Sequence, residues 1–266
     1  AVLLATARSM LDGDDRLVSI LPADHFVPDR DLFRQDFADA LALADEGYLV
    51  TMGIRPTRPE TGYGYIRASE SFVGDRAVLA DRFVEKPDRA TAAEYVADGR
   101  FYWNSGMFFF RQDRMMEEIR RVDASWTGVL ERMAEALTFP EPSRSESLRD
   151  LLQGLPNTSV DYAIMEHARG IALLPARYRW SDVGSWETVA GLAAGTADPR
   201  ALILEGEEGT CRIFRAPDAP VVALVGLDDC VVAASKDAVL VLRKGDGQRV
   251  RDVVELLRAR GLEELL

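Results

Sequence analysis

Two aspartates lie where apolar runs of the sequence end, in positions suited to hold a metal ion. Asp24 follows the apolar run Leu17 to Leu21, and Asp182 lies between a predicted strand and a predicted helix. Ligands of α/β sheets bind beyond strand ends, and a carboxylate there can hold Mg²⁺ while water and phosphates complete its coordination. A shared cation also removes the repulsion between two bare carboxylates. Asp24 and Asp182 are therefore candidate catalytic Mg²⁺ ligands. The simpler alternatives are that Asp24 caps the segment after it and that Asp182 is the N-cap of the helix carrying Trp186.

A charged pair, Glu85 and Lys86, ends another apolar run and is followed by Pro87. Lys86 is one of three lysines among 32 basic residues, and the others are arginines. A composition so biased toward arginine would supply arginine wherever only charge was needed. The retained lysine therefore indicates a compact ammonium group that meets a phosphate. The alternative is an exposed pair that only aids solubility.

Three further segments carry groups suited to a small polar ligand. Gly62 and Tyr63 lie within Thr61 to Ile66, where glycine lets the backbone approach a ligand and tyrosine can wall a pocket. Asn104 lies on the edge of an aromatic strand, where its amide could bind sugar hydroxyls, and Asp161 opens a predicted helix. An ordinary turn would explain the glycines equally well, and helix capping would explain Asp161.

The scaffold that carries these residues is predicted to be α/β, because short apolar runs alternate with helical patterns through most of the chain. The run Leu17 to Leu21 is typical of a buried central parallel strand. Further strands are predicted over 48–54, 78–84, 107–110 and 171–174, and helices over 2–10, 33–44, 91–97 and 186–192, with mostly helical structure over 111–152. After Pro199, short strands at about ten-residue spacing precede a final helix over 248–259. We predict a main domain over residues 1–198 and a C-terminal β-rich module over residues 199–266.

Composition excludes several classes of function. The 266 residues carry a formal charge of −12, which disfavours nucleic acid as a partner. No apolar run approaches the roughly 20 residues of a membrane span, and the first residues lack a signal-peptide pattern, so we expect a cytoplasmic protein. Cys211 and Cys230 match no metal spacing and are expected to be buried thiols rather than a disulfide or a ligand pair.

Six motifs in their order and spacing resemble the mannose-1-phosphate guanylyltransferase family, also called GDP-mannose pyrophosphorylases. They are Leu21-Pro22-Ala23-Asp24-His25, Arg58 to Ile66, Phe83-Val84-Glu85-Lys86-Pro87, Trp103 to Phe108, Asp161 to Glu166 and Trp180 to Trp186. The resemblance runs from about Ala1 to Gly195 and continues more weakly through the C-terminal module. It implies a Rossmann-like nucleotidyltransferase domain in which mannose 1-phosphate attacks the α-phosphorus of GTP and releases pyrophosphate.

The resemblance also implies a role for each candidate residue. Mg²⁺ would be the cofactor, held by Asp24 and Asp182. Lys86 would neutralise the sugar phosphate or bind the sugar. The remaining substrate contacts would come from Glu85, Asn104, Asp161 and the backbone of Gly62, with Tyr63 beside it.

One family feature has no match in this sequence. Members open with a strand and a loop of the form Gly-Gly-x-Gly-Thr-Arg-Leu-x-Pro, which wraps the triphosphate, and nothing before Leu17 fits it. We therefore expect the nucleotidyltransferase domain to be incomplete at its N-terminus through truncation of the sequence. The alternatives are a non-catalytic sugar-phosphate-binding or regulatory paralogue, and a nucleotidyltransferase for another sugar 1-phosphate. A homodimer is one option for the assembly, because a β-rich C-terminal module often packs against a partner or its own catalytic domain.

Overall fold

The computed structural model describes residues 1–13, 16–193, 200–204 and 210–265, and these form two compact units. The first unit contains residues 1–23 and 27–180, and the second contains residues 24–26 and 181–266. The boundary predicted after residue 198 lies outside the described residues.

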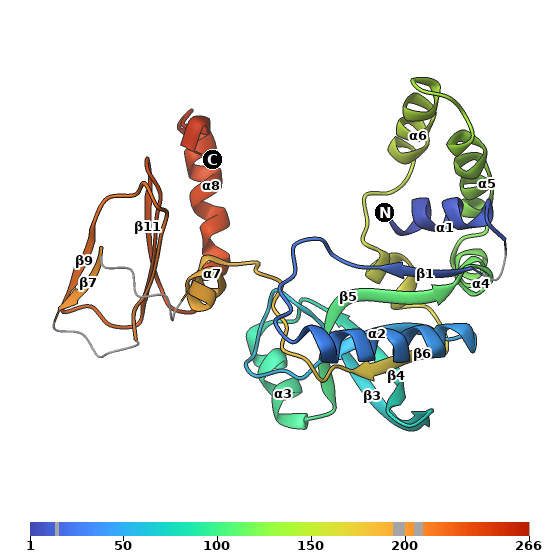
Figure 1. Ribbon diagram of the computed structural model, residues 1–266, viewed down its shortest axis with the longest axis horizontal. Helices are drawn as coiled ribbons and strands as arrows, with labels where there is room; N and C mark the ends of the chain where they lie inside the picture. The colour runs from blue at the N-terminus through green and yellow to red at the C-terminus, as the bar shows by residue number, and fades with distance from the viewer. Residues whose placement is uncertain (14–15, 194–199, 205–209, 266) are drawn as a thin grey trace. The chain divides into compact units, whose positions relative to one another are not determined.

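A six-stranded mixed sheet forms the centre of the first unit (Figure 1). Its strands are β1 (Leu17–Ile20), β2 (Leu49–Ile54), β3 (Gly64–Val73), β4 (Ala77–Glu85), β5 (Phe101–Arg111) and β6 (Ile171–Pro175). The order is β1-β5-β2-β6-β4-β3, and β3 also pairs with β5. Only β2 and β6 pair in parallel among these strands. The predicted α/β class is confirmed.

The prediction of a buried central parallel strand over Leu17 to Leu21 is wrong. Strand β1 pairs antiparallel with β5 and lies at one end of the strand order in the described part of the chain. Leu17 is exposed, and the other three residues of the strand are half-buried. A short, mainly apolar run does not distinguish a central strand from an end strand, because the sequence pattern indicates burial and not the number of neighbouring strands.

Helices cover both faces of this sheet, and alternate residues of β5 point into two different cores. Phe109 packs with α2 (Arg30–Asp45), whereas Phe110 packs with α1 (Val2–Met10), α4 (Gln112–Val122) and α5 (Ser125–Leu137). The remaining helical elements are α3 (Arg89–Asp98), α6 (Ser143–Gln153) and a π-helical turn, η1 (Asp161–Met165). Among the described residues, no helix is both long enough and apolar enough to cross a membrane.

A charged cluster joins α2 to the segment after β6. Asp36 is fully buried and accepts hydrogen bonds from Arg76 Nη1 at 2.9 Å, Arg177 N at 2.8 Å and Arg177 Nε at 2.7 Å. Asp39 on the next turn of α2 also pairs with both arginines, at 2.6 and 3.2 Å, but remains 46% exposed. Arg76 Nη2 donates in addition to Pro175 O at 2.9 Å. Helix α2, the turn between β3 and β4, and the end of β6 are therefore held together by ion pairs as well as by apolar packing.

The second unit is a small β module with two helices (Figure 1). It contains α7 (Trp186–Ala193), β7 (Ala201–Leu204), β8 (Arg212–Arg215), β9 (Val222–Val225), β10 (Cys230–Ala234), β11 (Val239–Arg243) and α8 (Val250–Ala259), with 3₁₀ turns at Gly247–Arg249 and Glu263–Leu265. Strands β11, β10 and β8 form one sheet, and β7 pairs with β9. The predicted short strands are confirmed. Cys211 and Cys230 are free and buried in the core of this module, as the sequence predicts.

Candidate functional site

A short antiparallel pairing in the second unit brings the two predicted metal ligands to neighbouring positions. Phe26 N donates to Ser181 O at 2.8 Å, and Ser181 N donates to Phe26 O at 3.0 Å. Continuing this register places Asp182 opposite His25, one residue away from Asp24. Burial lowers the pKa of His25, while the charges of Asp24 and Asp182 act in the opposite direction. Both carboxylates therefore lie close enough to His25 to affect the pKa of its imidazole.

The carboxylate of Asp182 is held by a local turn. Gly184 N donates to Asp182 Oδ1 at 3.2 Å, and Val183 adopts a positive φ of 53°. A Cβ atom at position 184 would collide with Asp182 Oδ2, so the turn requires glycine there. Helix α7 is capped instead by Ser185, whose Oγ accepts from Thr188 N at 3.2 Å. The alternative that Asp182 is the N-cap of this helix is therefore wrong.

The alternative role for Asp24 also finds no support in the next helix. The N-cap position of α2 belongs to Asp29. Its carboxylate binds Arg179, and these hydrogen bonds lower the pKa of Asp29 to about 2. Asp24 is exposed.

A pair of carboxylates is chemically suited to a magnesium ion. Mg²⁺ is usually bound through one or two carboxylates, and water and phosphates supply the remaining ligands. No group of three or more His, Cys, Asp or Glu side chains in the described residues could hold a metal ion, so a site made only of protein ligands is not seen there. An open pair of aspartates is the donor set expected for an ion that also binds a phosphate.

In the first unit, a second polar group forms where β5 passes η1. Asn104 Nδ2 donates to Asp161 Oδ1 at 2.7 Å, and Thr51 Oγ1 donates to Asn104 Oδ1 at 3.2 Å. Burial, and then the charge of Glu85, raises the pKa of the Asp161 carboxyl. Asp161 therefore does not cap its helical turn through its side chain. It orients the amide of Asn104, and it lies near a second carboxylate at the end of β4.

Lys86 occupies an unusual backbone conformation beside this group. Its φ is +47°, in the left-handed region that non-glycine residues rarely adopt. Its N–H donates to Tyr63 O at 3.2 Å, and its ammonium lies 2.9 Å from Glu85 Oε1. The Lys86 side chain remains 53% exposed, whereas that of Glu85 is 14% exposed. Such strained residues cluster at functional sites, which favours a binding role for Lys86 over a solubility role.

In the glycine-containing loop, the backbone of Gly64 makes a close approach to Glu85. Gly62 N donates to Glu60 Oε1 at 3.2 Å, so its N–H already has a protein acceptor. Gly64 pairs with Glu85 across β3 and β4, and a Cβ atom there would lie 2.5 Å from Glu85 Oε2. The absence of a side chain at Gly64 therefore sets the position of the Glu85 carboxylate.

Sequence reasoning missed an aromatic cluster around Tyr63. Its ring centroid lies 5.1 Å from that of Trp103 and 5.5 Å from that of Trp180, both in edge-on contacts. Arg58 lies over the Trp103 ring at 5.4 Å. Trp103 is next to Asn104 in β5, so the cluster borders the polar group. Because Tyr63 contacts residues 40 and 117 positions later, only the shared aromatic type hinted at this packing.

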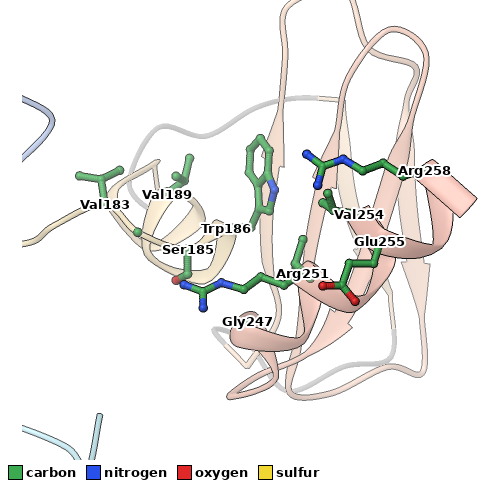
Figure 2. A pocket seen from close by; sticks show the side chains of 11 residues that line it. Val183, Ser185, Trp186, Val189, Gly247, Arg251, Val254, Glu255 and Arg258 are labelled. Carbon is green, nitrogen blue, oxygen red and sulfur yellow. The ribbon is translucent and has the colours of Figure 1, made fainter. Parts of the chain in front are cut away.

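The second unit also contains a pocket of about 550 Å³ between α7 and α8 (Figure 2). Trp186 and Val189 line it from α7, and Arg251, Glu255 and Arg258 line it from α8. None of the predicted site residues is among its lining residues.

Comparisons with known proteins place both parts of the chain near one group of enzymes. A family described as nucleotidyl transferase matches residues 1–198, and one described as the MannoseP isomerase/GMP-like beta-helix domain matches residues 210–257. The chain is 38% identical over 256 residues to mannose-1-phosphate guanylyltransferase of Escherichia coli K12, covering 94% of this chain and 53% of that protein. It is 36% identical over 264 residues to the xanthan biosynthesis protein XanB of Xanthomonas campestris pv. campestris (strain ATCC 33913), covering 99% of this chain and 56% of that protein. The chain thus spans about half the length of the curated relatives it matches.

A solved structure is also similar over most of both chains. It is the crystal structure described as mannose-1-phosphate geranyltransferase from Thermus thermophilus. It is 34% identical, has a TM-score of 0.78, and the match covers 97% of this chain and 74% of that chain. The similarity extends over the described parts of both units.

Proposed function

The chain belongs to the nucleotidyl transferase family, and we propose that it transfers GMP from GTP to mannose 1-phosphate, giving GDP-mannose and pyrophosphate. The named relatives support this choice of substrates, since the Escherichia coli enzyme is a mannose-1-phosphate guanylyltransferase and matches 94% of this chain. The observation in the structure that carries the proposal is the pairing of Phe26 with Ser181, which brings Asp24 and Asp182 beside His25.

The polar group of the first unit is suited to bind the sugar. Glu85 and Asp161 can accept hydrogen bonds from hydroxyls, and Asn104 can donate or accept. Because Asn104 is already oriented by Asp161 and Thr51, it would bind without losing much conformational freedom. Lys86 brings a positive charge that can leave Glu85 for a phosphate oxygen. Gly62 and Tyr63 remain predicted substrate contacts.

The carboxylates of the second unit are suited to hold the cofactor. Asp24 and Asp182 would bind Mg²⁺, and the ion when bound would neutralise phosphate charge during the transfer. Asp182 meets this role in a fixed orientation because Gly184 N holds its Oδ1. The reaction needs no covalent enzyme intermediate, so orientation and charge neutralisation account for most of the rate enhancement.

The direct test of the proposal is pyrophosphate release by the full-length protein in the presence of GTP, mannose 1-phosphate and Mg²⁺. We expect release that requires all three components and stops when the metal is chelated. Calorimetry should show binding of both substrates, with weaker binding of glucose 1-phosphate and of UTP. Binding of mannose 1-phosphate without binding of GTP, together with no pyrophosphate release, would support the non-catalytic paralogue instead.

The cytoplasmic location, the absence of nucleic acid partners and a homodimeric assembly remain predictions.

The approach of Gly64 to Glu85 gives a prediction for substrate affinity. We expect Gly64→Ala to weaken mannose 1-phosphate binding by about 10- to 100-fold, because the added Cβ displaces the Glu85 carboxylate and a shift of about 1 Å is enough to produce such losses. Isothermal titration calorimetry measures the change. Gly128→Ala is the matched control, since Gly128 lies within α5 and a Cβ there meets no atom within 4 Å. Equal affinities for wild type and Gly64→Ala would remove Glu85 from the sugar contacts.

A further inference from the structure

The two cysteines of the chain are neighbours in the core of the second unit. Strands β8 and β10 pair in parallel, with Val231 opposite Arg212. Continuing this register by one residue places Cys230 opposite Cys211. Cys230 shares a face of β10 with Val232 and Ala234, and the same core cluster contains Cys211. The two side chains therefore leave adjacent strands on the same face of the sheet.

Their sulfur atoms are already close to bonding distance. Cys230 Sγ and Cys211 Sγ lie 2.8 Å apart, whereas the S–S bond of a disulfide is about 2.05 Å. Neighbouring strands are separated by about 4.8 Å, within the range of Cα separations that disulfides span. Bond formation would thus require the sulfurs to move together by less than about 1 Å, with no rearrangement of β8 or β10.

We propose that Cys211 and Cys230 are a reversible oxidation site that forms an intramolecular disulfide across β8 and β10. The oxidant is a low-molecular-weight disulfide such as oxidised glutathione. One protein thiolate attacks a sulfur of that disulfide, releases one small thiol and leaves a mixed disulfide. The second protein thiolate then displaces the other small thiol. The two protein thiols lose two protons and two electrons in total, and the small disulfide is reduced to two thiols.

Burial of the two cysteines makes the thiols slow to react. It also protects the disulfide from reductants once it has formed. The two cysteines are 7% and 8% exposed. Cys211 Sγ donates to Leu227 O at 3.0 Å, and burial, followed by the hydrogen bond to Cys211, raises the pKa of Cys230 to about 11. Few thiolates are therefore present at neutral pH. The site would respond to sustained oxidising conditions rather than to brief exposure.

Oxidation would close a covalent ring from residue 211 to residue 230, which contains β8 and β9 and ends at the first residue of β10. A ring of this size restricts the unfolded chain and stabilises the folded module. The proposal concerns this module alone and does not depend on the proposed transferase activity.

The test is incubation of the purified chain with oxidised glutathione, with diamide as a smaller oxidant, followed by intact-mass analysis and tryptic mapping without reduction. We expect a loss of two hydrogens and a cross-link between the peptides 201–212 and 216–236. We also expect the melting midpoint of the second unit to rise by about 5 °C or more, and to fall again after dithiothreitol. Cys211→Ala and Cys230→Ala should each abolish the rise.

Three results would overturn the proposal: a chain that stays reduced under both oxidants, separate glutathione adducts on both sulfurs, or cross-linking between two chains. The double variant Cys211→Ala/Cys230→Ala controls for effects of the oxidants on other residues. Its melting midpoint should be the same before and after oxidation.

Discussion

Asp182→Asn is expected to lower the rate of pyrophosphate release by about 100- to 1000-fold. The amide keeps the size of the carboxylate and can still accept the hydrogen bond from Gly184 N, so the turn should persist. The substitution removes the negative charge that would hold Mg²⁺. We therefore expect the affinity for Mg²⁺, measured by calorimetry, to fall by about tenfold or more along with the rate.

A matched control is available for this substitution. Asp123 makes the same kind of turn, with Ser125 N donating to its Oδ1 at 2.9 Å, and no metal role is proposed for it. Asp123→Asn should leave turnover and Mg²⁺ affinity unchanged. If Asp182→Asn turned over at the wild-type rate, the assignment of Asp182 as a metal ligand would be wrong.

Asp36→Ala is expected to destabilise the first unit by about 2–4 kcal/mol. Breaking a buried ion pair by removing one partner costs about 3–5 kcal/mol, and the loss should be smaller here because Arg76 and Arg177 are 30% and 38% exposed. The backbone N–H of Arg177 would also lose its acceptor. Urea denaturation followed by circular dichroism measures the change in the free energy of unfolding.

Asp39→Ala is the control that separates the effect of burying a carboxylate from the effect of its charge. Asp39 contacts the same two arginines but is 46% exposed, so its removal should cost less than about 1 kcal/mol. Similar losses for both variants would show that the number of ion pairs, and not the burial of Asp36, determines the stability of this cluster.

Local patterns predicted most of the helices and strands because their signals lie within the elements themselves. Asp88 accepts from Thr91 N at 2.8 Å at the start of α3, and Gly99 ends this helix with a φ of 75°. Both residues can be recognised from the sequence alone. The neighbours of a strand cannot be recognised in this way. The apolar run that forms β1 carries no information on its antiparallel partner β5, which follows about 80 residues later.

For the candidate site residues too, the identity of the residue could be predicted from the sequence, whereas its distant contacts could not. Asp24, Lys86, Asn104, Asp161 and Asp182 were predicted as chemical groups from motif and resemblance. The long-range contacts of Asn104 and Asp161 were not predicted, because they join segments that lie far apart in the sequence. The Asn104–Asp161 hydrogen bond spans 57 residues, and the aromatic cluster of Tyr63, Trp103 and Trp180 spans 117. Gly64 could not be distinguished from Gly62 because only the pairing of β3 with β4 shows which glycine faces Glu85.

The pairing of Phe26 with Ser181 also limits when the two predicted metal ligands can meet during synthesis of the chain. The two residues are 155 positions apart, and a ribosome adds about 5–20 residues per second. Asp24 is therefore added to the chain about 8–30 s before Asp182. Nearly all of the first unit lies between them in the sequence. A nascent chain could therefore not bind the metal through both aspartates before all six strands of the sheet had been synthesised.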